Sequence, residues 1–80
     1  MNAKEMFEYE GYELFERNKK HLIYVHTESS ITIMFYFDFK QYVIGEQKDI
    51  LENHQKGDLV AVAIEDHKAI NKQLEELGWL

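Results

Sequence analysis

The clearest pattern of hydrophobic and polar positions lies in residues 31–37, Ile-Thr-Ile-Met-Phe-Tyr-Phe. Alternate residues of a β-strand share a face, so the odd-numbered positions of this segment predict one fully apolar face. The other face carries Thr32, Met34 and Tyr36 and is also largely apolar. Such a segment at the edge of a sheet would promote aggregation. We therefore expect a central strand, with one face in the core and the other partly covered.

Shorter segments with the same two-residue period predict the rest of a sheet. In addition to 31–37, the expected strands are residues 12–17, 22–27 and 41–44. Polar turns are expected at residues 18–20, 28–30 and 38–40. Residues 59–63 combine two valines with small alanines and predict a fifth short strand. Residues 46–57 are mostly polar, so a loop and a poorly packed helical turn are both compatible with them.

Each end of the sequence predicts a helix. Asn2 is a preferred N-cap and Glu5 follows three residues later, so a short helix is expected to run to about Tyr9 and to stop at Gly11. A longer amphipathic helix is expected to start near Ile64. Its apolar stripe is Ile70, Leu74 and Leu77, and Gly78 follows where a helix ends in the left-handed conformation.

The order helix, four or five strands, helix predicts one α+β domain over residues 1–80. Short turns join antiparallel neighbours, so the strands are expected to form a meander. Both helices are expected to pack on one face of that sheet. The aromatic content of 14% suits a small core, because each aromatic side chain buries roughly 150–250 Å².

The composition limits where the protein acts. The sequence has no cysteine and no proline. No segment resembles a signal peptide, and the longest uncharged run, residues 29–37, is far shorter than the ~20 residues that span a bilayer. We expect a cytoplasmic monomer with no membrane association. The net charge of −6 also argues against binding to phosphate backbones, although Arg17, Lys19, Lys20 and His21 form a local basic cluster that we interpret as a solvated turn.

No pattern in the sequence predicts catalysis, a metal site or a cofactor. The four histidines are His21, His26, His54 and His67, and no two of them have the i, i+4 spacing of a helical zinc site. No GxSxG nucleophile motif and no glycine-rich phosphate loop occurs. Paired acids such as Glu75 and Glu76 have the pattern of a solvated surface. The sequence therefore favours a non-enzymatic protein.

Three tyrosines form the candidate interaction surface. Tyr24, Tyr36 and Tyr42 lie in predicted strands and would form a base-stacking platform if they shared one face of the sheet. Arg17, Lys19 and Lys20 would then lie at the edge of this platform. The simpler interpretation is aromatic packing between neighbouring strands.

The ends of the chain resemble a group of small phage proteins. Residues 3–8, Ala-Lys-Glu-Met-Phe-Glu, with Gly11-Tyr12, and residues 68–79, Lys-Ala-Ile-Asn-Lys-Gln-Leu-Glu-Glu-Leu-Gly-Trp, look like segments of small uncharacterised proteins of phages and prophages of low-GC Gram-positive bacteria. The resemblance covers about 25 residues and implies a cytoplasmic protein of the host cell. It carries over no catalytic or binding residue. The chain departs from the group before the last helix, where residues 61–65 lack a Ser or Thr cap.

These observations favour a non-catalytic protein-interaction module, a phage or prophage accessory protein that contacts a host or phage protein. Aromatic side chains left on a surface are typical anchors of such contacts. One alternative is a single-stranded nucleic-acid-binding sheet that uses the three tyrosines. Another is an acidic surface that imitates nucleic acid and blocks a basic site on a protein.

Overall fold

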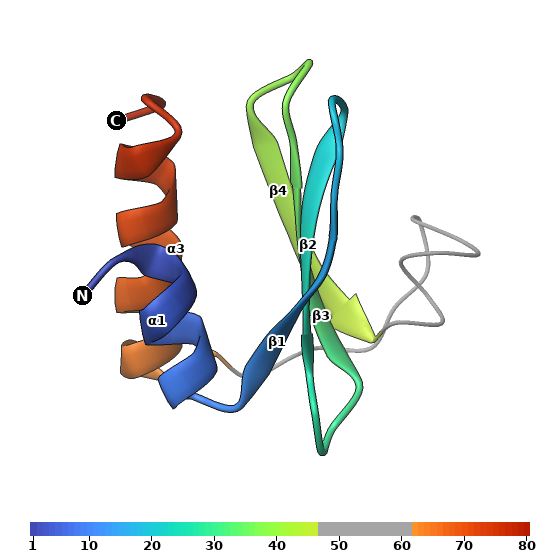
Figure 1. The fold of residues 1–80 in the computed structure, drawn as a ribbon, viewed down its shortest axis with the longest axis vertical. Coiled ribbons are helices and arrows are strands. Elements are labelled where there is room, and N and C mark those ends of the chain that lie inside the picture. The colour runs from blue at the N-terminus through green and yellow to red at the C-terminus, as the bar shows by residue number, and fades with distance from the viewer. Residues whose placement is uncertain (47–61) are drawn as a thin grey trace.

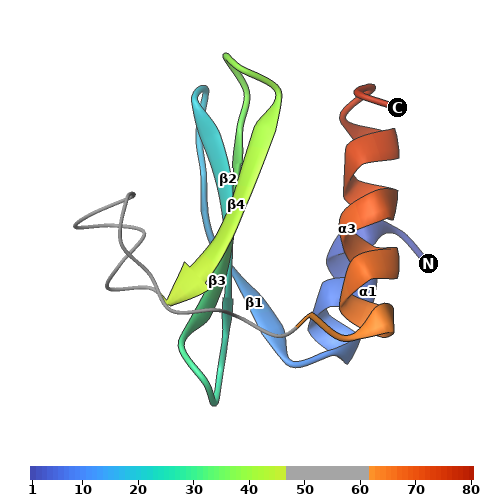
Figure 2. The same cartoon turned by 180° about the vertical axis from the view of Figure 1, so that it is seen from behind.

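The chain forms two layers, a four-stranded sheet and a pair of helices on one of its faces. A computed structural model describes residues 1–46 and 62–80 (Figure 1). The elements are α1 (Ala3–Tyr9), β1 (Tyr12–Arg17), β2 (His21–His26), β3 (Ile31–Tyr36), β4 (Gln41–Glu46) and α3 (Ile64–Glu76). The strands pair in the order β1-β2-β3-β4, and every pair is antiparallel. The expected α+β meander with both helices on one face is confirmed (Figure 2).

The strands begin and end within two residues of the expected positions. The expected fifth strand at 59–63 is not formed at residues 62 and 63, which belong to no strand, and residues 59–61 lie outside the described residues. The segment 46–57, for which a loop and a helical turn were both compatible, also lies outside them from residue 47 onward.

Local capping fixes the short helix α1. The Asn2 side chain accepts a hydrogen bond from the Glu5 amide at 2.8 Å, and the Asn2 amide donates to the Glu5 carboxylate at 2.9 Å. The Ala3 amide donates to the carboxylate of Glu76 in α3 at 2.7 Å. Free amides at a helix N-terminus favour carboxylates, so this contact also joins the two helices. Gly11 follows α1 with a φ of 91°, a conformation that glycine adopts without strain.

The helix α3 has an uncapped start and a well-defined stop. Its N-cap, Ala63, makes no side-chain hydrogen bond, in agreement with the lack of a Ser or Thr there. At the other end, Gly78 has a φ of 79° and its amide donates to the Glu75 carbonyl at 3.0 Å. The Trp79 amide donates to the Leu74 carbonyl at 2.9 Å. These two bonds form a Schellman motif, which satisfies carbonyls that the helix leaves free.

The main core lies between the sheet and the helices. Its fully buried members come from both layers and are Phe7, Tyr12, Leu22, Tyr24, Ile33, Phe35, Ala69 and Ile70. The opposite face of the sheet holds a smaller cluster around Ile23 and Met34, which are 2% and 3% exposed. Both faces of β3 are therefore buried, and the second face is covered more completely at Thr32 and Met34 than the sequence predicts.

A bulge in β1 changes which side chains face the helices. Leu14 pairs with Tyr24 and Glu16 pairs with Ile23, so Phe15 is an extra residue in the ladder. A bulge shifts the alternation of the strand by one position. Arg17 consequently pairs with Leu22 and shares its helix-facing side of the sheet.

Candidate interaction surface

The three tyrosines that the sequence singles out do not form one platform. Tyr24 faces the helices and is 2% exposed; its ring stacks on Phe7 with centroids 4.1 Å apart. Tyr42 pairs with Phe35, so it lies on the same face of the sheet, and it is 40% exposed. Tyr36 packs against the Ile23 and Met34 cluster on the opposite face. The condition for a stacking platform, one shared face, is therefore not met, because pairing register and not strand membership decides which residues lie together.

Tyr24 is a structural residue. Its hydroxyl donates a hydrogen bond to Oε1 of Gln73 in α3 at 2.8 Å, and both residues are buried. Burial raises the pKa of Tyr24 to about 12, with a further contribution from the nearby Glu76 carboxylate. Burial likewise raises the pKa of Tyr12 to about 12, assisted by the charge of Asp66. Both hydroxyls therefore stay protonated over the physiological range and belong to the core.

Two turns meet at one end of the sheet. In a meander, the turn after β1 and the turn after β3 lie at the same end, the upper end in Figure 1. The Phe37 amide donates to the Lys20 carbonyl at 2.9 Å and so joins the two turns. The Asn18 side chain accepts from the amides of Lys20 and His21 at 2.8 and 3.0 Å and shapes the first turn. We call residues 17–20 and 37–40 the turn end.

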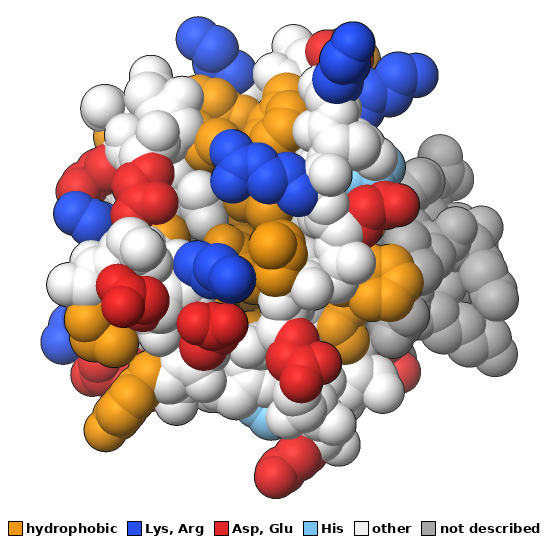
Figure 3. Space-filling view, viewed as in Figure 1, with side chains coloured by type: hydrophobic (Ala, Val, Ile, Leu, Met, Phe, Trp, Pro, Cys, Tyr) orange, Lys and Arg blue, Asp and Glu red, His pale blue; other side chains and the backbone are white. Residues whose placement is uncertain are grey.

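The turn end is rich in positive charge. Four of the nine Lys and Arg residues of the chain lie there, namely Arg17, Lys19, Lys20 and Lys40. All four are exposed, and within residues 1–46 and 62–80 none of them forms an ion pair. Figure 3 shows blue side chains gathered at this upper end and more red side chains below. Asp38 is the one acidic residue of the turn end.

A large apolar side chain lies among these cations. Phe39 is 73% exposed, whereas Phe37 is half-buried and packs against Trp79 with ring centroids 6.4 Å apart. Lys40 has a φ of 51°, in the left-handed region that costs a residue with a Cβ roughly 1–2 kcal/mol. Strained backbone at a non-glycine residue is often found at functional sites.

The turn end differs from the basic cluster that the sequence indicates. His21 is not part of the turn end, because its Nε2 contacts the Glu16 carboxylate at 2.5 Å. Lys40 and Phe39 join it from a turn some 20 residues later in the chain. A meander places both turns at the same end of the sheet. The expected order of the strands was therefore a signal for this cluster, and the search for charge along the sequence did not use it.

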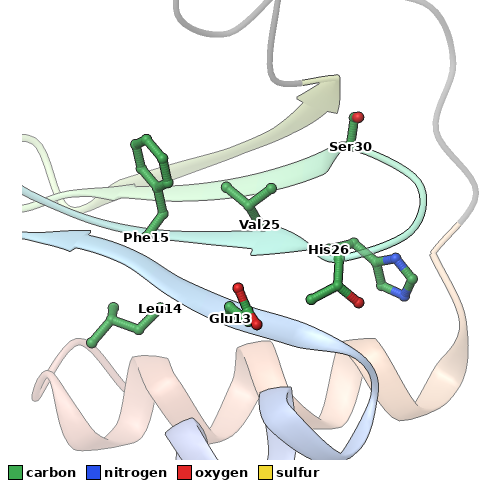
Figure 4. Close-up of a pocket in the computed structure, with 7 residues that line it drawn as sticks. Glu13, Leu14, Phe15, Val25, His26 and Ser30 are labelled. Atoms are coloured by element: carbon green, nitrogen blue, oxygen red, sulfur yellow. The ribbon is translucent and has the colours of Figure 1, made fainter.

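A separate hollow of about 460 Å³ lies along β1 and β2. Figure 4 shows Phe15 and Val25 on one side of this strand pair and Leu14 on the other. The His26 ring is occupied by structural contacts, because its Nδ1 accepts hydrogen bonds from the amides of Glu28 and Ser29, both at 3.2 Å. The lining residues are Glu13, Leu14, Phe15, Val25, His26, Thr27 and Ser30, which include no paired nucleophile and base.

The described part of the chain, residues 1–46 and 62–80, contains no cluster of side chains arranged as a metal site. Among residues 1–46 and 62–80, no group of three or more His, Cys, Asp or Glu side chains is placed to hold a metal ion. In the same residues, every buried side-chain nitrogen and oxygen has a hydrogen-bond partner. His67 is exposed on α3, and His54 lies outside the described residues. None of the described helices has the length and apolar character needed to cross a bilayer.

Comparison of the chain with protein families, with curated proteins and with solved structures finds no match.

Proposed function

We propose that this protein is a small, non-catalytic protein-interaction module, a phage or prophage accessory protein that acts in the host cytoplasm. The observation that carries the proposal is the turn end, where Phe39 is exposed among four cations without ion-pair partners in the described residues. Protein interfaces commonly bury an aromatic anchor near their centre and keep polar groups at a solvent-accessible rim. The phage origin is supported by the resemblance of residues 3–12 and 68–79.

Contacts within the fold hold the side chains of Tyr24, Gln73 and His26, which supports a structural role for them over a catalytic one. Tyr24 and Gln73 bond to each other across the two layers. His26 holds the turn between β2 and β3 through two backbone amides. A catalytic base needs an unoccupied nitrogen or oxygen within reach of a substrate. The Nδ1 atom of His26 is instead engaged by the backbone.

The alternative function, binding of single-stranded nucleic acid on the sheet, loses its main support. Base stacking on a sheet needs aromatic rings side by side on an open face. Tyr24 is buried, and Tyr36 lies on the opposite face from Tyr42. The cations of the turn end remain available, so nucleic acid is kept as an outcome of the experiments below.

One observation favours the alternative in which an acidic surface of the protein imitates nucleic acid. Residues 1–10 and 64–76, which hold both helices, contain seven Asp and Glu and three Lys, a net charge of −4. The helix layer is thus the more acidic part of the molecule. A mimic would present this layer to a basic site on a partner protein.

A capture experiment tests the proposed function. Tagged protein is incubated with lysates of a low-GC Gram-positive bacterium before and after phage infection, and bound proteins are identified by mass spectrometry. A tagged acidic protein of similar size serves as the control. Specific retention of one protein is expected, and a strongly basic partner held by the helix layer would favour the mimic. Empty capture from both lysates contradicts the proposal.

A further inference from the structure

The turn end also indicates the chemistry of its partner, and this inference rests on the proposed function. We infer that Phe39 inserts into an apolar pocket on a partner protein, and that acidic side chains rim this pocket and contact Lys19, Lys20 and Lys40. Three features of the turn end carry the inference, namely the freedom of Phe39 from the fold, the protruding shape of the turn and the charge around it.

Phe39 makes little contribution to the fold. The turn between β3 and β4 is held by the Phe37 amide, which donates to the Lys20 carbonyl, and by the contact between Phe37 and Trp79. Phe39 lies between Asp38 and Lys40 with 73% of its surface exposed. With 73% of its surface exposed, the Phe39 ring buries little area in the free protein, so we assign its role to the bound state.

The shape of the turn end requires a concave partner. The turn between β3 and β4, which carries Phe39, extends beyond the helix layer at the upper end of the sheet in Figures 1 and 2, and the turn between β1 and β2 ends level with that layer. An apolar side chain on a projecting turn loses its contact with water only when it enters a pocket of the other molecule. Burial of most of a Phe side chain in such a pocket strengthens binding by roughly tenfold to a hundredfold, which is the scale of an interface anchor.

The charges require an acidic rim. Lys19, Lys20 and Lys40 lie in the same two turns as Phe39, and the only nearby opposite charge in residues 17–20 and 37–40 is Asp38. Cations without ion-pair partners around an apolar anchor complement carboxylates around an apolar pocket. Arg17 adds a planar guanidinium suited to paired carboxylate oxygens.

The overall charge favours a compact acidic site over a long polyanion. The helix layer carries a net charge of −4 and the whole chain −6. A nucleic acid that extended from the turn end toward the helices would meet like charge. A partner that contacts only the turn end meets its cations alone.

A titration followed by NMR chemical shifts tests the chemistry. The probes are a 12-residue peptide of alternating Glu and Leu, its Lys and Leu counterpart, a 12-nucleotide oligothymidine and vesicles that contain phosphatidylserine. The acidic peptide is expected to shift residues 17–20 and 37–40, and the basic peptide is not. The peptides test the charge preference of the turn end, and shifts by the basic peptide as large as those by the acidic peptide overturn the inference. Shifts of the same residues by oligothymidine or vesicles at lower concentration overturn it too.

Matched variants locate the contact. Phe39→Ser is expected to weaken binding of the partner protein captured from lysate about thirtyfold, the loss typical of an interface anchor. Lys19→Glu with Lys20→Glu is expected to abolish the shifts. The controls are Tyr9→Ser, because Tyr9 is 82% exposed on α1, and Lys4→Glu with Lys68→Glu, which makes the same charge change on the helices. Equal loss in the controls contradicts the inference.

The same variants separate the inference from the proposed function. If the wild-type protein captures a partner from lysate and Phe39→Ser captures it equally well, the inference fails and the interaction module remains. If the wild-type protein captures nothing, the proposed function fails. Loss of capture by Phe39→Ser but not by Tyr9→Ser supports both.

Discussion

The helix-facing core and the turn end use the same residue types in opposite ways. In the core, Phe7, Tyr24 and Phe35 are between 0% and 2% exposed, and the ring of Phe7 contacts the rings of the other two. At the turn end, Phe39 is 73% exposed and lies in the same two turns as four Lys and Arg residues. The residue type therefore does not tell a core aromatic from a binding aromatic. The pairing register and the topology decide which role each ring takes.

The difference predicts a large loss of stability when the core is opened. Phe35→Ala is expected to lower the free energy of unfolding by roughly 3–5 kcal/mol, because Phe35 is fully buried between Phe7, Tyr42 and Trp79. In a domain of this size, such a loss approaches the whole margin of stability. Urea unfolding followed by tryptophan fluorescence measures it. A midpoint equal to that of the wild type would place Phe35 outside the core.

The closing segment after α3 is expected to contribute less than Phe35. Removal of residues 78–80 deletes the Schellman motif and the half-buried Trp79, whose ring contacts Phe35 and Phe37. We expect a loss of about 2 kcal/mol, from half of an aromatic side chain's buried area. Amide exchange at residues 70–77 should become faster. Removal of Leu80 alone, which is 72% exposed, is the control and should leave exchange unchanged. Unchanged exchange in the longer deletion would make the segment a candidate docking peptide.

The buried hydrogen bond of Tyr24 is expected to contribute about 1–2 kcal/mol, because Tyr24→Phe leaves Oε1 of Gln73 buried without its donor. The variant also tests how the free energy of unfolding depends on pH. The pKa of Tyr24 is about 12 in the folded protein and about 10 in an unfolded chain. A raised pKa stabilises the fold fully below pH 10, and this stabilisation is lost as the pH rises through 12.

Two measurements check the tyrosine prediction. Absorbance at 295 nm should show Tyr12 and Tyr24 ionising near pH 12 in the wild type, and one fewer such group in Tyr24→Phe. The free energy of unfolding should fall less steeply between pH 10 and 12 in the variant. A titration in which all five tyrosines ionise together near pH 10 would contradict the burial of both rings.

Local patterns in the sequence predict the elements well. The alternation of residues 31–37, the capping pair Asn2 and Glu5, and Gly78 after the apolar stripe all act within a few residues of chain, and the structure confirms each of them. Such signals depend on the two-residue and 3.6-residue periods alone. The fold class follows from their order.

The faces of the sheet are harder to predict, because they depend on contacts between strands. The bulge at Phe15 shifts half of β1, and no local pattern marks it. The register of β3 with β4 places Tyr42 opposite Phe35, while Tyr36 lies on the other face. The turn end joins residues from two separate turns. A search for runs of charge along the sequence finds residues 17–20 and misses residues 37–40. The meander order was sufficient to predict that these turns meet.

The smallest effect on stability is expected at the turn end itself. Phe39→Ser should change the free energy of unfolding by less than about 0.5 kcal/mol, because surface substitutions away from caps, cores and networks usually fall in that range. Thermal unfolding measured beside Phe35→Ala gives the direct contrast between the two aromatics. A loss comparable to that of Phe35→Ala would show that Phe39 packs into the fold, and the turn end would then lose its anchor. An unchanged melting curve together with lost binding would assign Phe39 to recognition alone.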